Sequence, residues 1–171
     1  VCLGLVNQIR ENNDKYSFSC KCHTHKAKPL LINSPDDWLD YLDVVNNNWP
    51  KNISEDDIIK LKNAIELIKK REYPEKTFLY NYEFHINFIR KLIKTTESRD
   101  KIIKSIIHRL ISNEEESSKK PLRNEYITKK KEYRFRVTGV SRIHYDYIGN
   151  IRKKIRFLMY YGESEHDDGL K

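Results

Sequence analysis

The chain has 171 residues, of which 38% are hydrophobic and 34% charged, and its formal net charge is +8. This hydrophobic fraction, with 11 tyrosines and 6 phenylalanines, excludes a wholly disordered chain, and the length allows one or two compact domains. No run of about 18 apolar residues is present, which excludes a transmembrane helix. The 3 cysteines, an odd number, give no disulfide framework. We therefore expect an intracellular, cytoplasmic protein without a membrane partner.

The positive charge is concentrated in the last third of the chain. Residues 119–171 contain 14 lysines and arginines against 7 acidic residues, whereas residues 1–118 contain 19 against 18. A basic excess localised in this way indicates a polyanionic partner, nucleic acid first and an acidic protein second. The alternative is a solvated surface that only keeps the protein soluble.

The first part of the chain predicts one strand followed by helices. Residues 15–25 alternate apolar and polar side chains, which is typical of a half-buried strand. Ser34 and Ser54 each stand before acidic residues and an apolar stripe at helical spacing, so we expect each serine to cap a helix.

Pro74 marks a break, and we place the domain boundary there. Residues 1–75 then form a mostly helical N-terminal region and residues 76–171 a second domain. Within the second domain, "KTFLY" at 76–80 predicts a short strand, and apolar side chains at helical spacing over about 81–112 predict a helical hairpin.

After Pro121 the apolar period changes from 3.6 to 2, which predicts a sheet. Residues 113–121 before it contain no apolar side chain and predict a solvated linker. Four strands follow, "LRNEYI", "KEYRFRV", "SRIHYDYI" and "KIRFLMYY", with tight turns at Gly139 and Gly149. The predicted fold is therefore α+β, a helical hairpin packed on a four-stranded, mainly antiparallel sheet, with an extra mostly helical N-terminal region.

The two strands within "EYRFRVTGVSRIHYDYIG" each carry basic side chains on one side only. If the strands pair, one face is aromatic and aliphatic, and the other carries Arg134, Arg136, Arg142 and His144. Guanidinium groups fit phosphate oxygens and remain charged, and a histidine can move a proton near neutral pH. These groups suit cleavage of a phosphodiester by a ribose 2′-hydroxyl. The alternative is a basic outer face that solubilises the edge of a sheet.

The successive pieces "KPLRNE", "YRFRV", "SRIHY" and "IRFLMYY" resemble the C-terminal half of the RelE/ParE toxin superfamily. The resemblance covers about residues 76–168 and implies a RelE-like fold. It implies a metal-independent endoribonuclease of the toxin-antitoxin type that needs no cofactor. The implied partners are RNA, including ribosome-bound mRNA, and a cognate antitoxin. The alternative is a non-catalytic module that binds nucleic acid or a protein target such as gyrase.

The resemblance also implies roles for single residues. Arg142 would contact the scissile phosphate, Arg134 and Arg136 the flanking phosphates, and His166 or His144 would transfer protons. The segment "GESEHDDG" is acidic where several members are basic, and its carboxylates would repel RNA or supply a general base. Further basic residues are expected to add salt-sensitive affinity for RNA: Arg123, Lys129, Lys130, Lys131, Arg152, Lys153 and Lys154.

Two alternatives concern the rest of the chain. The segment "CKCHTH" contains the zinc-ligand types Cys20, Cys22, His23 and His25, but it lacks the second, distant pair of a closed finger. We expect ordinary strand residues there and no metal site, with zinc as the alternative. Residues 1–75 are nearly neutral and could act as a fused regulator that covers the basic face or the hairpin.

Overall fold

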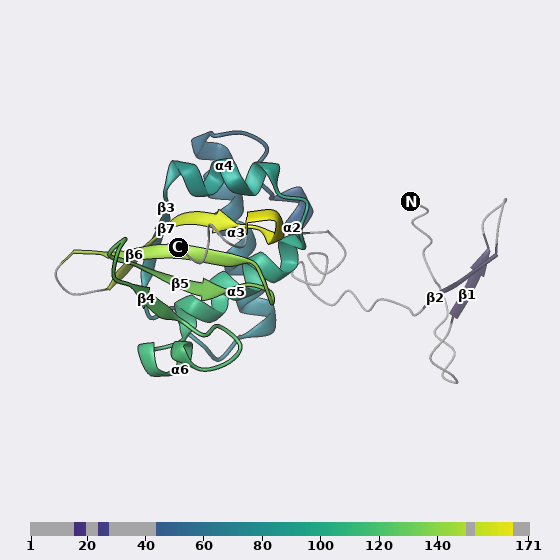
Figure 1. Cartoon of the computed structure of the whole chain (residues 1–171). Helices are drawn as coiled ribbons and strands as arrows, with labels where there is room; N and C mark the ends of the chain where they lie inside the picture. The colour runs from purple at the N-terminus through teal and green to yellow at the C-terminus, as the bar shows by residue number, and fades with distance from the viewer. Residues whose placement is uncertain (1–15, 20–23, 28–43, 150–152, 166–171) are drawn as a thin grey trace. The chain divides into compact units, whose positions relative to one another are not determined.

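The computed structural model describes residues 16–19, 24–27, 44–149 and 153–165 (Figure 1). The chain divides into two compact units, Val1–Tyr41 and Leu42–Lys171. In the first unit, β1 (Tyr16–Ser19) pairs with β2 (Thr24–Ala27) in an antiparallel sheet. The alternating segment at 15–25 therefore contributes to two short strands. The helix expected after Ser34 lies outside the described residues.

The second unit is an α+β fold in which helices pack on a five-stranded mixed sheet. The strand order is β3-β7-β6-β5-β4, in which β3 runs parallel to β7 and the other neighbours are antiparallel. The strands are β3 (Asn81–Phe84), β4 (Glu125–Ile127), β5 (Glu132–Arg136), β6 (Arg142–Ile148) and β7 (Lys154–Tyr161).

Five helices and one 3-10 turn accompany the sheet in the described part of this unit. The helices are α2 (Val44–Asn47), α3 (Glu55–Glu72), α4 (Ile86–Lys94), α5 (Arg99–Ile111) and α6 (Glu114–Ser118), and the turn is η1 (Glu163–Glu165). In Figure 1, α3 and α5 lie behind the sheet and α4 runs along its β7 side. None of the described helices is long and apolar enough to cross a bilayer.

The prediction of four strands is confirmed for β4 to β7, but the sheet has a fifth strand, and the strand expected at 76–80 is wrong. The fifth strand is β3, which begins at Asn81, after the expected segment. It is positioned by Tyr82 and Phe84, whose rings lie 6.4 Å and 5.7 Å from the ring of Phe157 on β7. Leu79, by contrast, is 48% exposed. Because β3 ends at Phe84, the next residue, His85, caps α4. Its Nδ1 accepts from the Asn87 backbone 3.2 Å away.

The predicted linker at 113–121 is also wrong, because it contains α6. This helix has no apolar stripe and instead depends on its cap. The Asn113 side chain accepts from the Glu116 backbone, and the Glu116 carboxylate accepts from the Asn113 backbone, which is a capping box. The cap predicted at Ser54 is confirmed, since its hydroxyl accepts from the Asp57 backbone at 3.1 Å.

Helix α3 is part of the second unit. Leu61, Ile65 and Ile68 on α3 are at most 1% exposed, and α3 packs against α5. The boundary expected between residues 75 and 76 consequently falls inside this unit.

One charged residue is buried in the core beneath the sheet. Arg109 on α5 is 0% exposed and donates to the hydroxyls of Tyr145, at 2.9 Å, and Tyr147, and to the Ser112 carbonyl. Its guanidinium carbon also lies 4.7 Å from the centre of the Tyr80 ring. Tyrosine hydroxyls and rings thus replace the carboxylate that usually accompanies a buried cation.

Candidate nucleic-acid interface

The pairing of β5 with β6 brings the four predicted basic side chains onto one face. Arg134 pairs with His144 and Arg136 pairs with Arg142 in the strand register. The opposite face carries Phe135, Ile143 and Tyr145, all 0% exposed, against the helices. We call Arg134, Arg136, Arg142 and His144 the arginine face. It is turned toward the viewer in Figure 1, since α3 and α5 lie behind the sheet.

The arginine face is more buried than an outer face. Arg142 is 3% exposed and His144 is 0% exposed. The position of β6 in the middle of the sheet contributes to this burial, because β7 flanks it on the side away from β5. The Tyr161 ring of β7 lies 4.6 Å from the His144 ring, and Met159 is the register partner of His144.

Two guanidinium groups on this face are incompletely bonded. Arg142 donates to its neighbours' carbonyls, to Ser141 at 2.9 Å and to Gly139 at 3.3 Å. The Nε atoms of Arg142 and Arg136 are buried and have no hydrogen-bond partner among the residues that the structure describes. A buried donor without a partner costs free energy, so these atoms favour an incoming acceptor.

The electrostatics of the face point the same way. Burial lowers the pKa of Arg142 below its ordinary value, and the nearby charges of Arg136 and Arg134 lower this pKa further. Like charges directly opposite each other on neighbouring strands are destabilising, as at the Arg136–Arg142 pair. A bound anion would relieve this repulsion.

His144 has a carboxylate partner that was not identified from the sequence. Its Nδ1 lies 2.7 Å from a carboxylate oxygen of Glu132. Such a contact fixes the orientation and tautomer of an imidazole. Glu132 stands two residues before Arg134, so the period of two that identified the arginines also places Glu132 on their face. Tyr161 could not be found in this way, because its place depends on the pairing of β7 with β6.

The remaining predicted residues lie around this face or outside the described part. Arg134 contacts Glu125 on β4 at 2.9 Å, so this carboxylate partly offsets its charge. Lys154 pairs with Glu83 at 2.5 Å. Lys129, Lys130 and Lys131 form the exposed turn between β4 and β5, and Arg123 and Lys153 are also exposed. Arg152 and His166 lie outside the described residues.

Glu97 connects the edge of the site to the helices. Its carboxylate accepts from the Ser141 hydroxyl at 2.5 Å, the Tyr160 hydroxyl at 2.6 Å and the Glu163 backbone at 2.6 Å. Burial raises the pKa of Glu97, but these three hydrogen bonds outweigh burial and hold the pKa below its usual value. Because Ser141 directly precedes Arg142, Glu97 fixes the start of β6. We call Glu97 and its three donors the Glu97 cluster.

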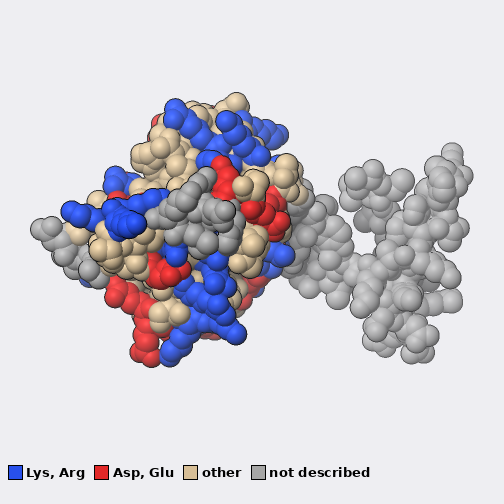
Figure 2. Space-filling view, in the orientation of Figure 1, with Lys and Arg blue, Asp and Glu red and all other residues tan. Residues whose placement is uncertain are grey.

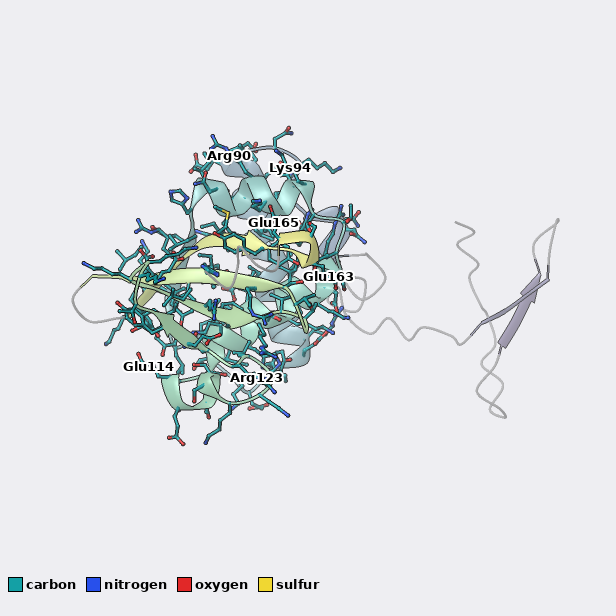
Figure 3. All side chains as sticks on the ribbon, in the orientation of Figure 1. Arg90, Lys94, Glu114, Arg123, Glu163 and Glu165 are labelled. Carbon is teal, nitrogen blue, oxygen red and sulfur yellow. The ribbon has the colours of Figure 1, made fainter. Side chains whose placement is uncertain are left out.

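The acidic segment after β7 is tied to the same region (Figure 3). The backbone of Glu163 belongs to the Glu97 cluster, and Glu165 forms an ion pair with Lys91 on α4. The charge of Glu165 is therefore offset by α4. Asp167 and Asp168 lie outside the described residues.

Within the described ranges no group of three or more His, Cys, Asp or Glu residues could hold a metal ion. Cys20, Cys22 and His23 fall outside these ranges, and His25 lies on β2. In comparisons with known proteins, no protein-family model, no curated protein and no solved structure matches this chain.

Proposed function

We propose that this chain is a RelE-like, metal-independent endoribonuclease of the toxin-antitoxin type, which cleaves mRNA by attack of a 2′-hydroxyl on the neighbouring phosphodiester. The observation that carries the proposal is the pair Arg136 and Arg142. These arginines face each other across two strands, and each has a buried Nε without a described partner. A phosphate group supplies both the acceptor oxygens and the negative charge that this pair lacks.

The residues of the arginine face take distinct roles in this proposal. Arg142 binds the scissile phosphate and stabilises the charge that grows on it in the transition state. Because Arg136 faces Arg142, it takes part in this contact, in addition to the flanking contact that the resemblance implies. Arg134, which also forms an ion pair with Glu125, contacts a flanking phosphate. Two protons must move: one leaves the 2′-oxygen and one is added to the 5′-oxygen. His144, which Glu132 orients, and His166 carry out these two transfers. A cognate antitoxin is the expected protein partner.

The test is RNA cleavage in the presence of EDTA, followed by analysis of the product ends. The unmodified chain should leave 2′,3′-cyclic phosphate ends. Arg142→Lys keeps the charge but loses the planar donor set, and Arg136→Gln loses the charge. Each should lower the cleavage rate about 100-fold, the typical loss of one transition-state donor.

Arg90→Gln is the matched control, because Arg90 is an exposed arginine on α4, away from the sheet face (Figure 3). Circular dichroism of each variant establishes that it is folded. Equal cleavage by the Arg142→Lys and Arg90→Gln variants would refute the proposed role of the arginine face.

The second candidate function is a non-catalytic module that binds nucleic acid or a protein target such as gyrase. The burial of Arg142 and His144, at 3% and 0% exposure, favours it, because a catalytic group must reach the substrate. Salt-dependent binding of RNA without any cleavage product would support this function over the first. Inhibition of gyrase supercoiling without RNA binding would identify the protein target instead.

A further inference from the structure

A pocket adjoins the arginine face where α6, β4 and the end of β5 meet. Its volume is about 380 Å³, and it is lined by Ser118, Lys120, Arg123, Asn124, Glu125 and Arg136. The backbone N–H of Arg136 donates to the Leu122 carbonyl at 2.7 Å, and that of Asn124 donates to the Ser117 carbonyl at 2.8 Å. These bonds join the α6–β4 loop to β5 and to α6, so the walls of the pocket are held in place.

The lining of the pocket is positively charged. Lys120, Arg123 and Arg136 are cations, and the one carboxylate in the lining, Glu125, lies 2.9 Å from the Arg134 Nε. The three glutamates of α6 lie in its first turn, before Ser118. In Figure 2, Lys and Arg atoms gather in the lower part of the visible face, where Figure 1 places β4 and the α6–β4 loop.

Two further features indicate a ligand. The buried Nε of Arg136 has no described hydrogen-bond partner, and Arg136 belongs to both the pocket and the arginine face. Arg123 has a φ of 47°, a left-handed conformation that is uncommon for a residue other than glycine and that concentrates at functional sites. This conformation belongs to the loop between α6 and β4, where Figure 3 labels Arg123.

The pocket is open to solvent, and its volume can be compared with that of a phosphate. At about 30 Å³ for each water-sized group, the five heavy atoms of a phosphate occupy about 150 Å³, less than half of the pocket. The remaining volume of about 230 Å³ is close to the roughly 240 Å³ that the eight further heavy atoms of an attached ribose occupy on the same scale. The lining offers amide, hydroxyl and cationic groups, which suit a sugar phosphate better than an apolar molecule.

We propose that this pocket binds a phosphate of RNA together with its sugar, next along the strand from the arginine face. The choice of RNA as the ligand rests on the proposed function. Arg136 belongs to both the arginine face and the pocket, and it contacts the RNA in both. The pocket thereby adds Lys120, Arg123 and Asn124 to the residues that hold the substrate.

The test measures binding of a short 2′-O-methyl oligoribonucleotide, which has no free 2′-hydroxyl and cannot be cleaved. The pocket variant combines Lys120→Gln with Arg123→Asn, since asparagine tolerates a positive φ. The control variant combines Arg90→Gln with Lys94→Gln, two exposed cations on α4 (Figure 3). Both variants lose the same charge, so any difference between them reports the position of the lost charges.

We expect the pocket variant to bind the probe about tenfold more weakly than the control variant. Its slope of log Kd against log salt should also be smaller by about 0.7, the value for one phosphate contact on a single strand. Equal dissociation constants for the two variants would overturn the proposal. Cleavage by the unmodified chain is measured separately. A failure of the pocket proposal, seen in binding, is therefore distinguishable from a failure of the nuclease proposal, seen in cleavage.

The same probe with and without a 5′-phosphate identifies the source of the phosphate. Tighter binding of the phosphorylated probe, lost in the pocket variant, assigns the pocket to a terminal phosphate. Equal binding of the two probes, weakened in the pocket variant, assigns it to an internal phosphodiester. Either result supports the pocket as a phosphate site.

Discussion

Replacement of Glu97 by alanine tests how the start of β6 is held. The substitution removes the acceptor for three donors, of which the Ser141 hydroxyl is on a 0% exposed residue and the Tyr160 hydroxyl on a 2% exposed residue. The Ser141 hydroxyl keeps the Thr138 hydroxyl as a partner at 2.9 Å, so the loss falls mainly on the Tyr160 hydroxyl and the Glu163 backbone. Each buried donor left without a partner costs about 1–3 kcal/mol. Because Glu97 itself is half-buried and water can replace part of the loss, we expect a total cost of about 3 kcal/mol.

Glu97→Gln separates the charge from the geometry. A glutamine keeps one acceptor oxygen for the Glu163 backbone, and the two hydroxyls of the cluster can turn to accept from its amide. We therefore expect Glu97→Gln to cost only about 1 kcal/mol. Because the pKa of Glu97 is lowered in the folded state, its charge stabilises the protein above the unfolded value of 4.5, and this contribution is lost as pH falls through the folded pKa. The difference between Glu and Gln should thus shrink in acid.

The assay is urea unfolding followed by far-ultraviolet circular dichroism at neutral and acid pH. Gly162 provides an independent check, since a Cβ added there would clash with a carboxylate oxygen of Glu97. Gly162→Ala should destabilise the normal chain by about 1 kcal/mol but cost little in the Glu97→Ala background, a non-additive pair. Additive effects of the two substitutions, or a cost below about 0.5 kcal/mol for Glu97→Ala, would refute this account of the cluster.

Two further predictions concern His108 and Arg109, which are neighbours on α5. Burial lowers the pKa of His108, whose Nε2 lies 2.8 Å from the Tyr73 hydroxyl. The stability of the protein should therefore fall as the pH drops below the unfolded pKa of 6.5. His108→Gln should remove this pH dependence, as measured by urea unfolding at several pH values. Tyr147→Phe deprives the buried Arg109 of an acceptor and should cost about 1–3 kcal/mol in thermal or urea unfolding, whereas Tyr126→Phe, at a 51% exposed position, should cost almost nothing.

The strands β5 to β7 and helices α3 and α5 are predictable because each has a clear apolar period. Helix α6 is not, since its five residues are stabilised by the Asn113–Glu116 capping box and not by an apolar face. The sequence favours a strand at 76–80 over one at 81–84, because "KTFLY" is more apolar than "NYEF". What distinguishes these two segments is the contact of Tyr82 and Phe84 with Phe157, which lies far along the chain.

The sequence predicts which face of the sheet carries the candidate site, but not how deeply its side chains are buried. A period of two placed Arg134, Arg136, Arg142 and His144 on one face, and the register confirms that placement. The burial of Arg142 and His144 depends on β7 as the neighbour of β6, which a two-stranded hairpin does not contain. Glu97 has no local signal at all, because its donors come from the β5–β6 loop, from β7 and from the start of η1.

The place of β7 in the sheet has a consequence for the order in which the molecule can form. Strand β7 separates β3 from β6, so neither can complete its pairing until the chain beyond residue 153 is available. Before that point β6 is an exposed edge, and His144 lacks the cover of Tyr161. Because domains form as the chain emerges during synthesis, the arginine face would be assembled among the last parts of the unit. A ribosome would then carry an incomplete site until synthesis of this unit is nearly finished.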